Sequence, residues 1–211
     1  MNQIDTLFQA VVDGNEAGAM AGAQACLQAN IPADQVMREG LIAAMTEVGR
    51  RFEASEYYLP DLVVAARAMR SALHMLQPSL AKVGMRSSGK VAIGTVQGDL
   101  HDIGKNLVGM MMEGAGFEVL DLGTDVSPAR FVEVVKNEQV NILCLSSMLT
   151  TTMPKMAATV EALKAAGQRD TVKVLVGGAP VTEEYARQAG ADGYGSDASA
   201  AVRLAVGFMG G

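Results

Sequence analysis

The sequence predicts a protein in two parts, an all-helical bundle followed by a parallel α/β sheet. Up to about residue 82, apolar residues recur at steps of three and four, which is the spacing of a buried helix face. Beyond residue 90, short apolar runs alternate with helical stretches, as strands and helices do in a parallel sheet. Hydrophobic residues make up 49% of the 211 residues, which is enough for a real core. We therefore predict a helical domain over residues 1–83, a linker over 84–89 and an α/β domain over 90–211.

The first part is expected to be a four-helix bundle. Pro78 should kink the fourth helix or end it near Gln77, because proline lacks an N–H donor. The helices are predicted over about 5–12, 16–29 and 34–52, and from residue 59 onward. The apolar stripe of the third helix contains Met37, Leu41, Met45, Val48 and Phe52, and the heptad-like seam of the fourth contains Leu59, Leu62, Ala66, Met69, Leu73, Leu76 and Leu80.

The second part alternates five short apolar strands with helices, which predicts a doubly wound parallel sheet. The order expected for such a sheet is flavodoxin-like, a Rossmann-like arrangement in which ligands bind where the first and third strands diverge. Strands are predicted at 91–96, 117–122, 141–146, 172–177 and 193–195, and helices at about 104–115, 128–137, 152–166, 182–189 and 198–208.

Composition excludes several classes of function. The net charge of -6, with no basic run, argues against a nucleic-acid surface. No stretch approaches about 20 uninterrupted apolar residues, so we expect no membrane partner. The N-terminus lacks a signal sequence, and a cytoplasmic location follows as the default. Cys26 and Cys144 form no CxxC pair, which fits a reducing compartment and gives no zinc site.

The segment from Asp99 to Gly104 carries the strongest chemical signal. It displays His101 on a predicted strand-to-helix loop, with a carboxylate two residues earlier and glycines on both sides. An imidazole in this place can bind a metal through one ring nitrogen while Asp99 accepts the other N–H. Asp99 could instead cap the next helix, but a cap would lie closer to the helix start. His74 sits mid-helix, which favours a helix-surface or core role.

Two further loops follow predicted strands and contain small and hydroxyl residues, at 146–152 and 177–180. In the flavodoxin-like order these loops and the histidine loop converge on one crevice. Glycines there let the backbone approach a ligand, and hydroxyls can hydrogen-bond it.

The Asp-x-His-x-x-Gly pattern of Asp99, His101 and Gly104 resembles the cobalamin-binding signature. Residues 90 to about 205 resemble a cobalamin-binding domain, and residues 1–85 resemble the helical cap of its methyl-transferring members. In the cap, Phe52 is followed seven residues later by Leu59 before a proline, as in the family. The chain is most similar to free-standing corrinoid proteins of methylamine, methanol or betaine methyltransferase systems, and more distantly to the cobalamin module of methionine synthase.

The resemblance implies a role for each of these residues. His101 replaces the cofactor's own base as the lower ligand of cobalt, and Asp99, His101 and Ser146 form a proton relay. Phe52 and Leu59 lie over the upper face of the corrin and shield the methyl group. Asp102 either bonds a corrin side chain or faces a partner protein. The remaining residues expected to bind the cofactor are Gly94, Thr95, Val96, Ile103, Gly104, Ser146, Leu149, Thr150, Gly177 and Gly178.

The resemblance also implies the function of a methyl carrier. A methyl group passes from a substrate-specific methyltransferase to Co(I), giving methyl-Co(III), and then to a second methyltransferase with a thiol or tetrahydrofolate-type pterin acceptor. A reductive activator is a third expected partner. The chain alone carries no substrate pocket, so we expect it not to be catalytic alone, and the linker at 84–89 is a candidate hinge.

Three alternatives remain open at this point. A cobalamin-dependent light or redox regulator shares the capped module but needs an output element. The small subunit of an adenosylcobalamin mutase shares the histidine motif but leaves Phe52 and Leu59 without a purpose. A receiver or nucleotide-binding module without a corrinoid leaves the histidine loop unexplained, and the chain lacks a GxGxxG or P-loop motif.

Overall fold

The computed structural model describes residues 2–82 and 88–210, except the side chains of 81 and 82. The chain divides into two compact units, residues 1–87 with 113–116, and residues 88–112 with 117–211. The predicted linker and hinge at 84–89 fall mostly outside the described residues. None of the described helices is long and apolar enough to cross a membrane.

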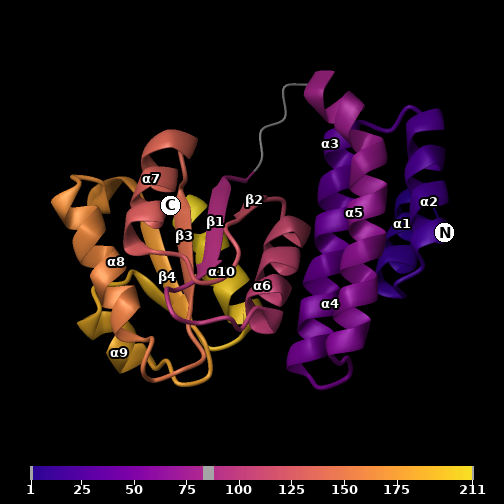
Figure 1. The fold of residues 1–211 in the computed structure, drawn as a ribbon. Coiled ribbons are helices and arrows are strands. Elements are labelled where there is room, and N and C mark those ends of the chain that lie inside the picture. The colour runs from indigo at the N-terminus through magenta and orange to yellow at the C-terminus, as the bar shows by residue number, and fades with distance from the viewer. Residues whose placement is uncertain (1, 83–87, 211) are drawn as a thin grey trace. The chain divides into compact units, whose positions relative to one another are not determined.

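The first unit is the predicted helical bundle (Figure 1). Asn2 and Asn15 cap the first two helices, and their side-chain oxygens accept backbone N–H groups of the first turns. Gly22 lets the second helix approach the first closely, because a Cβ there would lie 3.0 Å from the Cα of Leu7. The elements are α1 (Gln3–Val12), α2 (Glu16–Gln28), α3 (Ala33–Gln35), the π-helical η1 (Val36–Ile42), α4 (Ala43–Glu53) and α5 (Leu59–Lys82).

The bundle departs from the prediction in two details. The third predicted helix is present as α3, η1 and α4 without a break, and η1 is π-helical, with the N–H of Ala43 bonded to the carbonyl of Arg38. Second, α5 does not end near Gln77 but continues through Pro78 to Lys82. The proline removes one donor, and the apolar seam continues beyond it to the buried Leu80.

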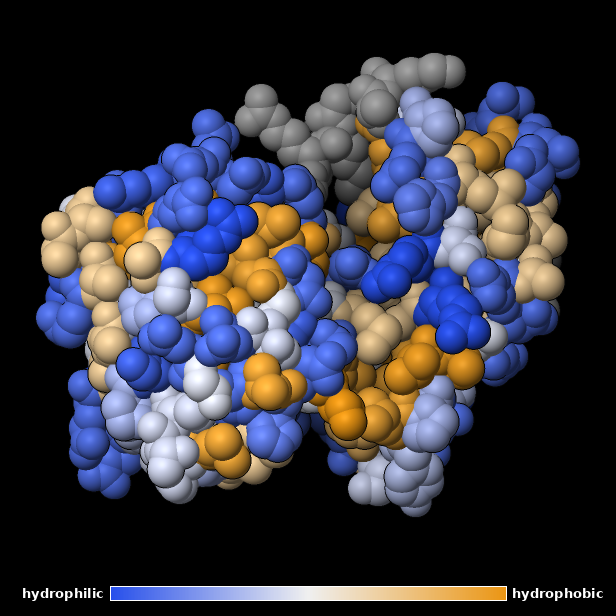
Figure 2. Space-filling view, viewed as in Figure 1, coloured by the Kyte–Doolittle hydropathy of each residue, from blue (hydrophilic) through white to orange (hydrophobic). Residues whose placement is uncertain are grey.

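His74 lies on the surface of α5, where its ring contacts the side chain of Gln77. This is one of the two structural roles predicted for it. On the face of the helical unit seen in Figure 2, polar and apolar surface are mixed, and an apolar patch lies in the lower half.

The second unit is a five-stranded parallel sheet in the order β2-β1-β3-β4-β5, as predicted. All carboxyl ends therefore meet at one edge of the sheet, the lower edge in Figure 1. The strands are β1 (Lys90–Thr95), β2 (Glu118–Asp121), β3 (Ile142–Ser146), β4 (Lys173–Gly177) and β5 (Gly193–Gly195). The helices are α6 (Ile103–Gly114), α7 (Pro128–Glu138), α8 (Pro154–Ala165), the short 3-10 helix η2 (Arg169–Thr171), α9 (Glu183–Gln188) and α10 (Ala198–Met209).

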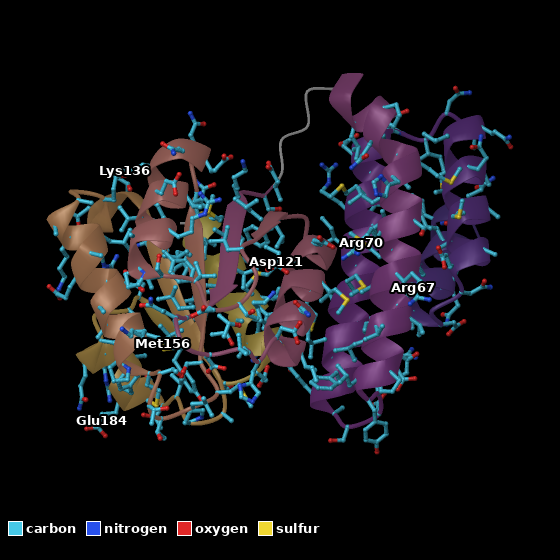
Figure 3. The ribbon with its side chains drawn as sticks, in the orientation of Figure 1. Arg67, Arg70, Asp121, Lys136, Met156 and Glu184 are labelled. Atoms are coloured by element: carbon cyan, nitrogen blue, oxygen red, sulfur yellow. The ribbon has the colours of Figure 1, made fainter. Side chains whose placement is uncertain are left out.

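Helices cover both faces of this sheet. On one face, strand residues such as Leu143 and Val174 pack with Phe131 of α7 and Met156 of α8, which is labelled in Figure 3. On the other face α6 and α10 cover the alternate strand residues. The three central strands β1, β3 and β4 are therefore buried on both sides, which explains why they are nearly continuous apolar runs.

Candidate functional site

The predicted histidine loop lies between β1 and α6, at the carboxyl edge of the sheet. The side chain of Asp99 is completely buried, whereas that of His101 is 54% exposed. Nδ1 of His101 lies 2.6 Å from Oδ1 of Asp99, and the same oxygen accepts the backbone N–H of His101 at 3.1 Å. A carboxylate only accepts hydrogen bonds, so Nδ1 carries the proton. Nε2 is then the nitrogen left with a lone pair.

The other carboxylate oxygen of Asp99 is held by the loop after β3. Oδ2 accepts the backbone N–H of Met148 at 2.7 Å and the hydroxyl of Thr152 at 3.0 Å. Burial by itself would raise the pKa of Asp99, but the hydrogen bonds from His101, Met148 and Thr152 outweigh it and hold the pKa well below the usual aspartate range. Asp99 is therefore a permanently charged support for the imidazole. It caps no helix, since its carboxylate oxygens bind the ring and the 148–152 loop.

The hydroxyl that binds Asp99 in the structure differs from the one expected. In the described part of the chain the hydroxyl that binds Asp99 is that of Thr152, not that of Ser146. Ser146 is the last residue of β3, paired in register with Thr95 and Gly177, and the chain must continue past it before it reaches Asp99. The sequence contains a signal for Thr152, a run of three threonines, but the run alone does not say which hydroxyl points inward.

A chain of buried hydroxyls continues from Thr152. Its Oγ1 lies 2.7 Å from Oγ of Ser147, and both oxygens lie within 3.2 Å of the carbonyl oxygen of Leu149. Thr152 has one proton to donate, and the charged Asp99 is its strongest acceptor. Ser147 then donates to Thr152 or to the carbonyl of Leu149. The polar chain attached to the histidine is therefore Asp99, Thr152 and Ser147.

The histidine loop is also braced by the neighbouring backbone. The hydroxyl of Thr95, which is fully buried, donates to the carbonyl of His101 at 2.7 Å. Asp125 accepts the N–H of Gly98 at 2.7 Å through its side chain and donates its own N–H to the carbonyl of Asp99 at 3.0 Å. Thr95 was predicted to bind the cofactor, and the structure uses its hydroxyl to position the loop. Asp125 was missed, because nothing in its sequence context marks it.

The predicted glycines fall into three environments. Gly178 has a φ of +132°, and a Cβ there would overlap the carbonyl oxygen of Ser147, so the 178 and 147 backbones touch. A Cβ on Gly177 would lie 3.0 Å from the carbonyl of Gly195. A Cβ on Gly94 would press on Phe131, so Gly94 belongs to the core and not to a crevice. Gly104 faces open space, with no atom within 4 Å of a Cβ.

Apolar side chains are exposed on both loops beside the histidine. Leu100 is 75% exposed and Ile103 is 71% exposed, and Met148 and Leu149 are also exposed on the loop that binds Asp99. Thr150 and Asp102 are exposed as well, whereas Val96 is buried. Exposed large apolar residues clustered at a polar loop indicate a ligand surface. The surface offers an imidazole nitrogen surrounded by apolar side chains.

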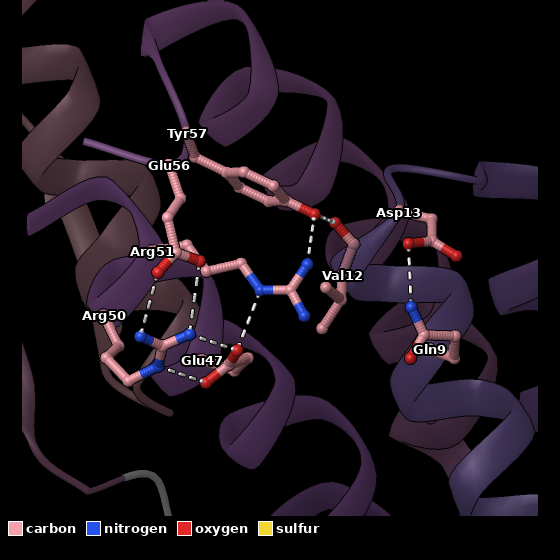
Figure 4. Close-up of polar contacts among 8 residues, drawn as sticks. All are labelled: Gln9, Val12, Asp13, Glu47, Arg50, Arg51, Glu56 and Tyr57. Carbon is pink, nitrogen blue, oxygen red and sulfur yellow. Dashed lines mark hydrogen bonds and ion pairs between the residues drawn. The ribbon is translucent and has the colours of Figure 1, made fainter. Parts of the chain in front are cut away.

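In the helical unit, Phe52 and Leu59 flank the turn between α4 and α5. Phe52 is partly buried and Leu59 is more exposed. A polar cluster holds this turn (Figure 4). Glu47 binds both Arg50 and Arg51 at 2.8 Å, and these hydrogen bonds lower the pKa of Glu47 to about 2.

Tyr57 completes the cluster that holds the turn. The guanidinium of Arg51 donates to the hydroxyl of Tyr57 at 2.9 Å and lies 5.1 Å from the centre of its ring. The hydroxyl of Tyr57 in turn donates to the carbonyl of Val12 in α1. The turn between α4 and α5 is therefore fastened to the end of α4 and to one other helix of its unit, α1.

Residues 89–203 match the family model of the B12 binding domain, and residues 3–77 match a second model with the same description. The chain belongs to the B12-binding corrinoid proteins. It is 39% identical to a corrinoid protein of Desulfitobacterium hafniense strain Y51, over 100% of this chain and 99% of that protein. It is 42% identical to a trimethylamine corrinoid protein of Methanosarcina barkeri, over 92% of this chain and 90% of that protein.

Two solved structures share the complete fold of this corrinoid protein. A cobalamin-binding protein from Desulfitobacterium hafniense DCB-2 has a TM-score of 0.83 at 34% identity, over 99% of both chains. The methanol:cobalamin methyltransferase complex MtaBC from Methanosarcina barkeri has a TM-score of 0.88 at 26% identity, over 99% of this chain and 80% of that chain. The predicted fold class and cobalamin as cofactor are confirmed, and the alternative of a nucleotide-binding module without a corrinoid is wrong.

The residues on the carboxyl edge fit this cofactor. Among the described residues no group of three or more His, Cys, Asp and Glu could hold a bare metal ion. A corrin ring brings its own equatorial nitrogens to cobalt, so a single imidazole ligand from the protein is sufficient. His101 offers that ligand, Asp99 fixes its orientation, and Leu100 and Ile103 offer apolar contact to a large flat ring.

Proposed function

We propose that this corrinoid protein carries a methyl group on the cobalt of its bound cofactor between two methyltransferases. The first is specific for the methyl donor, and the second passes the group to a thiol or a tetrahydrofolate-type pterin. The observation that carries the proposal is the geometry of His101, whose Nδ1 is bound to a buried carboxylate and whose side chain is exposed. The relatives support the methyl-transfer role, since several are corrinoid proteins for trimethylamine or dimethylamine.

Bound cobalamin supplies a cobalt that accepts a methyl group and releases it again. In this proposal His101 would hold the cobalt, and binding there would change the charge around Asp99. Thr152 and Ser147 adjust to that change, because hydroxyls can rotate their single proton between neighbouring acceptors. Phe52 and Leu59 provide the apolar cover for the methyl group.

The partner enzymes are part of the proposal. One similar solved structure is a methyltransferase complex, which supports docking of a donor-specific methyltransferase. We propose a reductive activator that restores inactive cobalt as a further partner. We also propose a cytoplasmic location for the protein and its partners.

A methylation assay tests the carrier function. The holoprotein is reduced to Co(I) and mixed with methylamines, methanol or betaines, and the visible spectrum is followed. The expected result is little or no change with the protein alone and rapid change when the cognate methyltransferase is added. Multiple turnovers of donor and acceptor by the isolated chain would contradict the proposal.

A further inference from the structure

Lys105 is a buried cation two residues into α6, close to the histidine loop. Only 2% of its side chain is exposed. Nζ lies 2.6 and 2.7 Å from the two carboxylate oxygens of Asp121 and 2.7 Å from Oδ1 of Asn106. All three ammonium protons therefore have an acceptor, as a buried charge requires. Asp121 is the last residue of the edge strand β2 (Figure 3), and 51% of its side chain is exposed.

One arm of the Lys105 network reaches the carbonyl of His101. Oδ1 of Asp121 also accepts the N–H of Gly123 at 2.8 Å, and the carbonyl of Gly123 accepts the N–H of Thr95 at 3.0 Å. The hydroxyl of Thr95 donates to the carbonyl of His101. Three hydrogen bonds of ordinary length, joined through Gly123 and Thr95, therefore connect Asp121 to the histidine.

A second arm reaches the residue after the histidine. Asn106, held by Lys105 through its side-chain oxygen, donates from Nδ2 to a carboxylate oxygen of Asp102 at 3.2 Å. The backbone N–H of Asn106 donates to the carbonyl of Asp102 at 2.8 Å. Lys105 therefore supports the loop on both sides of the peptide bond that joins His101 to Asp102.

Folding energy alone gives a weak reason for this arrangement. A buried ion pair contributes little net stability, because the desolvation of the charges offsets their attraction. A directional network is better suited to fixing geometry than to strengthening a core. The network is attached to the main chain of the exposed histidine, while Asp99 is attached to its ring.

We propose that Lys105, acting through Asp121 and Asn106, is a positioning residue that orders the backbone of the cobalt-binding histidine. The inference rests on the proposed function, in which His101 binds cobalt. Asp99 orients the imidazole ring of His101, and Lys105 orders its main chain. The position of Nε2 depends on both.

The test compares Lys105→Met with Lys164→Met. Methionine keeps the unbranched side chain of lysine and removes its charge. The carboxylate of Asp121, which loses its partner, is half exposed and can be hydrated by water. Lys164 gives the matched control, because its ion pair with Glu161 in α8 has no link to the loop. Amide hydrogen exchange of residues 98–103 is measured in the apoprotein, and the visible spectrum of the loaded protein reports the share of cobalt bound by His101.

For Lys105→Met we expect exchange at 98–103 to rise about tenfold and the affinity of His101 for cobalt to fall about ten- to a hundredfold. Lys164→Met should match the wild type. Wild-type exchange and spectrum in Lys105→Met, or equal changes in Lys164→Met, would overturn the proposal. If Lys105→Met does not fold, Asp121→Asn replaces it with the same expectations, and wild-type behaviour in that variant overturns the proposal. The exchange readout needs no cofactor, so it stays separate from a failure of the carrier function.

Discussion

The hydroxyl of Thr152 donates to Oδ2 of Asp99 at 3.0 Å, although 53 residues separate the two in the sequence. This bond joins the loop after β3 to the loop after β1. It gives the buried carboxylate a partner on the side opposite His101. The polar groups behind the histidine therefore come from two loops, the one after β1 and the one after β3.

Thr152→Val tests this bond. Valine has nearly the same shape as threonine, so the change removes a hydrogen bond to a charged group and costs about 2 kcal/mol of unfolding free energy. In the loaded protein it should also change the pH at which cobalt loses its histidine ligand. Chemical denaturation and a pH series of visible spectra measure the two effects. Ser146→Ala is the matched control and should change neither, because Ser146 does not bind Asp99. A larger effect for Ser146→Ala would support the relay implied by the resemblance, in which Ser146 takes part.

Asp99→Asn tests the charge of the carboxylate. The pKa of Asp99 is depressed in the folded protein, so its ionised form stabilises the fold fully above its unfolded value of about 3.9. This contribution is lost as the pH falls from there through the folded pKa. The difference in unfolding free energy between wild type and Asp99→Asn should shrink as the pH falls below about pH 4. A difference that does not shrink below this pH would refute the assignment.

Gly178 and Gly104 give contrasting predictions. Gly178→Ala should strongly destabilise the apoprotein, since its positive φ and its contact with Ser147 both exclude a Cβ. Gly104→Ala places a methyl group in open space within α6 and should leave the apoprotein stable or stabilise it by up to about 1 kcal/mol. Weaker cobalamin uptake by Gly104→Ala, at unchanged thermal stability, would then show that the cofactor lies over this residue. Normal uptake would remove Gly104 from the site.

The turn held by Tyr57 gives a prediction for the helical unit. Tyr57→Phe removes the hydrogen bonds to Arg51 and Val12 and should lower the unfolding free energy by about 1 kcal/mol. Tyr58→Phe is the control on an exposed neighbour and should have no effect.

Phe52→Ala should speed photolysis of the methyl–cobalt bond in the loaded protein, because the radical pair loses its cover. An unchanged photolysis rate would argue against the shielding role of Phe52.

The α/β part was predictable because its three central strands are buried on both faces. Runs such as Ile142 to Leu145 have no polar interruption, so their limits can be read directly. The histidine loop was predictable because a carboxylate and an imidazole lie two residues apart between glycines, in a pattern that resembles the cobalamin-binding signature. Long-range partners were not predictable in this way. Thr152 is one of three adjacent threonines, and only the folded loop decides which one faces Asp99.

The supporting residues carried even less signal. Asp121 ends the edge strand β2 and Asp125 follows it, and both look like ordinary surface carboxylates in the sequence. Their contacts with the histidine loop form only when β2 lies beside β1. In the bundle, the π-helical stretch and the passage of α5 through Pro78 depend on tertiary packing, which a stripe of apolar residues does not report. Local pattern therefore identified the element that carries His101 but not the residues that hold it.

The visible spectrum of His101→Ala loaded with cobalamin tests the central claim most directly. The account predicts a spectrum without a nitrogen lower ligand and a weaker hold on the cofactor, while His74→Ala, which changes a surface histidine, gives the wild-type spectrum. A wild-type spectrum at full occupancy in His101→Ala would contradict the account.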